Sequence, residues 1–90
     1  MPKFVVCCDM SKDIEAPDYE GLRRLLLRLF GIRAQSSVWF VDCDLTAKEL
    51  LDTLEEYALA GDRLMVIPLT TRPAWHFAYK GTGAWLNCRL

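Results

Sequence analysis

The stretch Gly31-Ile32-Arg33-Ala34-Gln35-Ser36-Ser37-Val38-Trp39-Phe40-Val41-Asp42 lies near the middle of the chain and decides how the rest is arranged. It predicts extended backbone, because β-branched and aromatic residues crowd together directly after a glycine. A helical pattern flanks it on each side, and beyond each helix lies a short apolar run of strand length. We therefore expect it to form the middle of one compact sheet, as one bent strand or as two short strands joined by a turn near Ser36 and Ser37.

The helix before this stretch is predicted over residues 18–30, where one helical face carries the apolar residues Leu22, Leu25, Leu26, Leu29 and Phe30. Asp18 suits the N-cap position, because its carboxylate can accept hydrogen bonds from the first free amides of the helix. Gly31 suits the C′ position, because helices commonly end on a residue with left-handed backbone.

The helix after this stretch is predicted to begin with a capping box. The Thr46 side chain can accept from the third helical amide, while Glu49 can reach back to the cap. Its apolar residues share one arc and its outer face is acidic, which would repel phosphate. Gly61 is predicted to end this helix.

Two apolar runs, Phe4–Cys8 and Arg63–Leu69, have the length and composition of buried strands. With the central stretch and the two helices, they predict an α+β fold, a ferredoxin-like βαββαβ sandwich. Both helices would cover one face of the sheet. The other face would be bare unless the tail or a second subunit covers it.

The tail alternates Trp75, Phe77 and Tyr79 with other residues, crosses a glycine-rich turn and resumes with Trp85. Such alternation across a turn predicts an extra C-terminal β-hairpin over residues 74–90, which would dock on a partner subunit. The chain is thus expected to be a single domain, residues 1–90, with its core in residues 1–70.

The composition indicates an apolar, nearly neutral domain. Its 90 residues are 52% hydrophobic and 11% aromatic, more than one small core needs, so some apolar surface is expected to meet another chain. A net charge of −1 excludes the strong positive field of a basic nucleic-acid-binding domain, so such binding would need a local basic patch. With no apolar run of about 18 residues and no signal-peptide pattern, we expect a cytoplasmic protein without a membrane partner.

The four cysteines lack the spacing of a zinc site, and in a reducing compartment they need not form disulfides. We therefore expect each of them to serve as a small buried hydrophobic residue. They are Cys7, Cys8, Cys43 and Cys88.

Two local signatures carry a resemblance to a known family. The first is an apolar strand that ends in an aspartate, Phe4-Val5-Val6-Cys7-Cys8-Asp9-Met10, and the second is Arg33-Ala34-Gln35-Ser36-Ser37-Val38-Trp39 after a glycine-closed helix. With Pro68-Leu69 ending the last core strand, the chain resembles the Cas2 family of CRISPR-associated proteins and the related VapD-like ribonucleases. The resemblance covers about the first 70 residues.

The resemblance implies a homodimer of ferredoxin-like domains whose sheets face each other and which binds nucleic acid. Cas2 proteins serve as the adaptor for the Cas1 integrase in spacer acquisition, and some members are metal-dependent endonucleases on RNA or DNA. The family's metal-binding aspartate falls on Asp9. Two copies of Asp9 across a two-fold axis are therefore expected to hold one Mg²⁺ as the catalytic centre.

Two alternatives stay open beside a Cas2-like adaptor. One is a VapD-like toxin endoribonuclease, and the other is a catalytically silent Cas2-like module that binds other proteins. The silent alternative is favoured by the loop Ser11–Glu15, which is acidic on balance where family members carry basic residues. Asp9 also suits an ordinary turn cap at the end of a strand.

The densest basic cluster supplies the candidate phosphate contacts, with an ordinary solvated helix face as the alternative. It comprises Arg23, Arg24, Arg28 and Arg33.

Five further residues are assigned to a dimer interface. Polar strand residues such as Gln35 and Ser37 more commonly serve packing or chain contacts than catalysis. Trp75, Phe77 and Tyr79 either stack on bases or form an interface core. Because few basic residues are interleaved with them in the sequence, we favour the interface.

Overall fold

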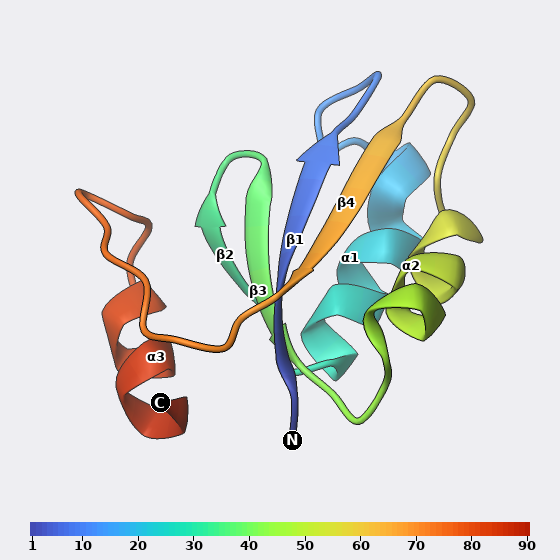
Figure 1. The fold of residues 1–90 in the computed structure, drawn as a ribbon. Coiled ribbons are helices and arrows are strands. Elements are labelled where there is room, and N and C mark those ends of the chain that lie inside the picture. Colours follow the sequence, from blue (N-terminus) through green and yellow to red (C-terminus); the bar gives the residue numbers. More distant parts are fainter.

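The computed structural model describes residues 1–90, whose elements follow the order β-α-β-β-α-β with one further helix (Figure 1). They are β1 (Lys3–Asp9), a 3₁₀ helix η1 (Pro17–Tyr19), α1 (Glu20–Arg28), β2 (Ile32–Gln35), β3 (Val38–Asp42), α2 (Ala47–Glu55), β4 (Arg63–Pro68) and α3 (Thr82–Arg89). The strands form one antiparallel sheet in the order β2-β3-β1-β4. The α+β class and the ferredoxin-like βαββαβ arrangement are confirmed.

The central stretch forms two strands rather than one bent strand. Ser36 and Ser37 make the turn between β2 and β3. Gln35 and Val38, the residues on either side of this turn, are paired with each other. The pairing is irregular between Arg33 and Gln35, which places a bulge near the end of β2. β1 lies at the centre of the sheet, between β3 and β4.

The first helix starts differently from the prediction. Pro17 begins the 3₁₀ turn η1, because proline suits the first position of a helical turn, where its missing amide is not needed. Asp18 lies inside this turn and accepts a 3.0 Å hydrogen bond from Lys12. Tyr19 is the N-cap of α1, without a side-chain hydrogen bond. The assignment of Asp18 as N-cap is therefore wrong.

The end of α1 is a Schellman motif shifted by one residue from the predicted C′ position. Phe30, not Gly31, has the left-handed backbone, with φ of 54°. The Phe30 amide donates to the Leu27 carbonyl and the Gly31 amide to the Leu26 carbonyl. Gly31 is still required, because a Cβ there would lie 2.4 Å from the Leu26 carbonyl oxygen.

The capping box of α2 is confirmed. The Glu49 amide donates to the Thr46 hydroxyl at 3.1 Å, and the Thr46 amide donates to the Glu49 carboxylate at 2.9 Å. The helix ends at Glu55, and Gly61 adopts its positive φ of 87° later, in the loop before β4. None of the helices has the length and apolar character that a membrane span needs.

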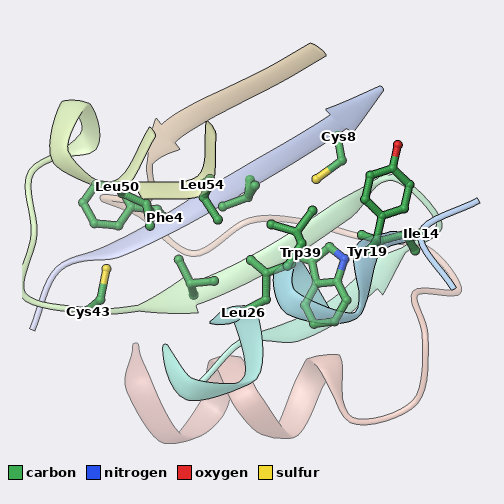
Figure 2. Packing of buried hydrophobic residues seen from close by; sticks show 12 residues of the cluster. Phe4, Cys8, Ile14, Tyr19, Leu26, Trp39, Cys43, Leu50 and Leu54 are labelled. Carbon is green, nitrogen blue, oxygen red and sulfur yellow. The ribbon is translucent and has the colours of Figure 1, made fainter. Parts of the chain in front are cut away.

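The main core lies between the sheet and helices α1 and α2 (Figure 2). Along β1, alternate residues point into it, because side chains alternate between the two faces of a strand. Leu26 of α1 and Leu50 and Leu54 of α2 are fully buried against this face. Each such side chain contributes about 1.5–3 kcal/mol of stability by its burial.

The predicted C-terminal β-hairpin over residues 74–90 is wrong, because residues 82–89 form the helix α3 on the sheet face opposite α1 and α2 (Figure 1). Trp85 and Leu86 are both buried against this face, in one cluster with Ala34 and Phe40. Neighbouring residues can share a buried face on a helix, whereas on a strand they point to opposite faces. The helix follows Gly81, whose φ of 94° turns the chain.

Candidate functional site at the end of β1

Asp9 is the last residue of β1 and its side chain is 74% exposed. Its neighbour Cys8 is buried toward α1 and α2, so Asp9 faces the opposite side of the sheet, which α3 covers only in part. The strand register places Arg63 of β4 directly opposite, and the two side chains form an ion pair of 3.6 Å. Both groups are exposed, so the pair contributes little stability and both remain accessible to a ligand.

Two hollows border Asp9. The larger has a volume of about 410 Å³ and is mostly apolar, with Val38 and Met65 among its lining residues and Asp9 as its only carboxylate. The smaller, of about 210 Å³, is mostly polar and includes Lys12 and Arg33. Asp9 therefore lines both an apolar and a polar depression.

The turn between β2 and β3 meets Asp9, because the Cys8 amide donates a 2.8 Å hydrogen bond to the Ser37 carbonyl. Ser37 is exposed and lines both hollows. Gln35 is exposed on the edge strand β2 and lines neither hollow. Of these two predicted interface residues, the structure brings only Ser37 to Asp9.

The four arginines of the predicted basic cluster differ in their partners, although Glu15 lies within ion-pair distance of both Arg23 and Arg33, at 3.9 and 3.1 Å. Arg23 donates to the carbonyl oxygens of Ile14 and Ala16, at 2.6 and 2.8 Å, and so holds the loop before α1. Arg24 donates to Glu20 one turn earlier on α1, at 2.6 Å. The Arg23 guanidinium therefore serves the chain's own structure, whereas the Arg24 pair is exposed and leaves its guanidinium accessible.

The other two arginines differ from each other. Arg33 lines the polar hollow, donates to the Ser36 carbonyl at 2.9 Å and pairs with Glu15 at 3.1 Å. Arg28 is exposed on α1 and has no ion pair. Only Arg33 of the predicted cluster therefore lies at the candidate site, where it offsets the acidic charge of Glu15.

The buried cysteines are confirmed as small hydrophobic residues. Burial, together with the charges of Cys7 and Asp62, raises the pKa of the Cys8 thiol to about 11. Burial also raises the pKa of Cys43. Both thiols stay protonated at neutral pH, and a protonated thiol is a poor nucleophile and metal ligand. Cys7 is half-buried, and the expectation of a small buried hydrophobic residue is wrong for Cys88, which is exposed.

No group of three or more histidine, cysteine or acidic residues lies close enough within one chain to hold a metal ion. In the polar hollow the other carboxylate is Asp13, which accepts a 2.8 Å hydrogen bond from the Glu15 amide. Mg²⁺ takes carboxylate and water oxygens, so this donor set fits it only if a second copy adds its own Asp9.

Asp62 is a residue that the sequence interpretation missed. Its carboxylate accepts hydrogen bonds from the Tyr19 hydroxyl, the Ser11 amide and hydroxyl, and the Leu59 amide, at 2.7 to 2.9 Å. Partial burial opposes its charge, but these hydrogen bonds outweigh burial and lower the pKa of Asp62. Asp62 thus fixes the loop that follows Asp9. A Gly-Asp turn signal was visible in the sequence, but its distant partners were not.

The aromatic residues assigned to the interface, Trp75, Phe77 and Tyr79, are all exposed. The backbone at Tyr79 lies beside β2, the edge strand of the sheet, because the Tyr79 amide donates a 2.9 Å hydrogen bond to the Ala34 carbonyl. Arg33 connects this segment with the candidate site, since its guanidinium lies 5.6 Å from the centre of the Tyr79 ring.

Comparisons with known proteins add no family to this description. No protein-family model, no curated protein and no solved structure matches the chain.

Proposed function

We propose that this chain is a Cas2-like homodimer that binds nucleic acid and serves as an adaptor for a Cas1-type integrase in CRISPR spacer acquisition. The proposal further places one Mg²⁺ between two copies of Asp9, with a nuclease activity at that centre. The observation that carries it is the position of Asp9, exposed at the end of the central strand on the partly uncovered face of a ferredoxin-like sheet.

The uncovered half of this face supports a second copy as its partner. α3 covers β2 and β3, whereas on β4 the side chains of Met65 and Ile67 are 59% and 42% exposed. Val5 and Cys7 of β1 are only half-buried beside them. A two-fold axis beside the end of β1 would bury this apolar strip against its own copy and bring the two Asp9 carboxylates together.

The residues around Asp9 suit a phosphate ligand once a cation is shared. Arg63 would bind a phosphate oxygen, because its exposed guanidinium has only a loose pairing with Asp9. The Ser37 hydroxyl lines both hollows and would donate a hydrogen bond to the same backbone. When bound, Mg²⁺ would supply a Lewis acid that polarises the phosphodiester.

A second candidate function is the catalytically silent interaction module. It is favoured by the pairing of Arg23, Arg24 and Arg33 with groups of the same chain, which leaves little free positive charge on α1. In this function the apolar strip on β1 and β4 would bind another protein.

The test compares wild type with Asp9→Ala for binding and cleavage of double-stranded DNA and single-stranded RNA, with Mg²⁺ or with EDTA. Asp44→Ala is the matched control, because Asp44 is also exposed and lies outside both hollows. Salt-sensitive duplex binding by a dimer supports the adaptor, and Mg²⁺-dependent cutting lost only in Asp9→Ala supports the nuclease centre. RNA-only cutting indicates the toxin ribonuclease, and no binding to either ligand indicates the silent module.

A further inference from the structure

Charge is distributed unevenly along the chain. All 12 acidic residues lie at or before Asp62, and every charged residue after it is basic. The basic residues of this last part are Arg63, Arg72, Lys80 and Arg89. Arg63 faces Asp9 and Arg89 pairs with the buried Asp42, so two cations remain for the segment between β4 and α3.

This segment, residues 72–80, is named here the aromatic segment. In Figure 1 it is the orange loop that projects past β2, on the side of the sheet opposite α1 and α2. Phe77 is 95% exposed, and Trp75 and Tyr79 are 41% and 47% exposed. Three aromatic side chains thus face solvent in one short stretch, which is rare unless they contact a partner.

Each end of the aromatic segment carries a cation against a ring. The Arg72 guanidinium lies 5.3 Å from the Trp75 ring centre and is fixed by a 2.6 Å hydrogen bond to Asn87 of α3. At the other end the Arg33 guanidinium lies 5.6 Å from the Tyr79 ring centre. The fold therefore supplies the interleaved cations that the sequence alone did not show.

The backbone of the aromatic segment is fixed where it returns to the domain. The Tyr79 amide donates to the Ala34 carbonyl, and the Thr82 hydroxyl donates to the Tyr79 carbonyl at 2.7 Å. Between these anchors and Trp75, Phe77 has a left-handed φ of 55°, a conformation that costs free energy in any residue with a Cβ. The left-handed backbone at Phe77 thus displays an almost fully exposed phenyl ring beside these anchors.

We infer that the aromatic segment binds single-stranded nucleic acid, with bases stacked on Trp75 and Phe77 and phosphates on Arg72 and Lys80. Exposed rings with adjacent cations are the arrangement that binds single strands regardless of sequence, whereas the bases of a duplex are already stacked. Arg33 lies both at Tyr79 and in the polar hollow beside Asp9, so a bound strand would lead toward Asp9. The inference rests on the proposed function only in taking nucleic acid as the ligand.

The test measures fluorescence anisotropy of labelled oligothymidine, oligouridine and a DNA duplex of equal length, for the full chain at low and moderate salt. The variants are Phe77→Ala and Arg72→Gln, and the matched controls are Leu27→Ala and Lys48→Gln, which change an exposed apolar residue of α1 and an exposed basic residue of α2. Phe77 is almost fully exposed, so its replacement leaves the fold intact, which circular dichroism checks.

The expected result is single-strand binding that Phe77→Ala weakens about 5- to 100-fold, while both controls bind as wild type does. Arg72→Gln is expected to weaken binding and to reduce the slope of log affinity against log salt by about one unit. The oligothymidine and oligouridine arms show whether DNA or RNA binds more tightly.

Three results would overturn the inference: no single-strand binding, binding that neither variant weakens, or a Phe77→Ala protein that loses dimerisation instead. Duplex binding accompanied by no single-strand binding, or by single-strand binding that Phe77→Ala leaves unchanged, would remove this inference and leave the proposed function standing. Single-strand binding that depends on Phe77, without any effect of Asp9→Ala on dimerisation or cleavage, would support this inference and contradict the proposed Asp9 centre.

Discussion

The indole nitrogen of Trp85 donates a 2.7 Å hydrogen bond to the carbonyl oxygen of Phe30. It joins α3 to the C′ residue that follows α1, across 55 positions of sequence. Arg89, one turn later on α3, lies 4.5 Å from the Trp85 ring centre and bonds Asp42 of β3 at 3.1 Å. The C-terminal helix is thereby attached to the domain by specific polar contacts as well as by burial.

Trp85→Phe is expected to lower the free energy of unfolding by about 1–2 kcal/mol, because it removes this donor and part of a buried ring. Urea unfolding followed by circular dichroism measures the change. Trp75→Phe is the control and should change stability little, because Trp75 is partly exposed. Equal stability of Trp85→Phe and wild type would show that α3 is not attached in this way.

Phe30→Gly is expected to raise the free energy of unfolding by about 1 kcal/mol. Glycine adopts the left-handed conformation at the C′ position of α1 without the strain that Phe30 carries. Phe30→Ala retains a Cβ and should bring no such gain. A stabilisation by alanine equal to that by glycine would mean that removal of the exposed ring, rather than backbone strain, is responsible.

Asp62→Asn is expected to lower stability at neutral pH by about 2 kcal/mol, because hydrogen bonds to a charged carboxylate are lost. The folded pKa of Asp62 lies below its unfolded value, so its contribution is full above about pH 4 and is lost as pH falls through the folded pKa. Stability curves between neutral and acidic pH should therefore converge for the two proteins below about pH 4. Parallel curves would contradict this role.

Met65→Lys is expected to shift a dimer toward monomer, because it places a charge in the apolar strip on β1 and β4. Met65 is exposed in the single chain, so the fold should be retained. Sedimentation velocity over a concentration series measures the shift, with Leu27→Lys as the control on α1. A dimer that tolerates Met65→Lys but not changes elsewhere would place the interface on another face.

The sequence predicted the sheet and both core helices well because local patterns and buried faces agreed there. The capping box at Thr46 and the strand-length apolar run of β1 agree with the buried faces around them, and the structure confirms both. The tail misled because alternation of Trp75, Phe77 and Tyr79 favours a strand, whereas the burial of Trp85 and Leu86 selected a helix. Whether this segment forms a strand or a helix depends on tertiary packing, and the periodicity of the sequence carries no information about that packing.

The candidate site was predictable only in part. Asp9 was predictable because it ends an apolar strand. The position of Arg63 opposite Asp9 was not, because it depends on the register between β1 and β4. The partners of the arginine cluster were not predictable, because folding brings them from other segments of the chain. Arg23 donates to the carbonyl groups of a loop, and Glu15 pairs with both Arg23 and Arg33.

The pairing of two Asp9 carboxylates around one divalent cation is the central claim, and Mn²⁺ titration followed by electron paramagnetic resonance tests it most directly. Mn²⁺ replaces Mg²⁺ at oxygen ligands, and its free signal reports how much is bound. The account predicts one bound Mn²⁺ per two chains, lost in Asp9→Asn and retained in the Asp44→Asn control. Absence of binding, or binding that persists in Asp9→Asn, would contradict it.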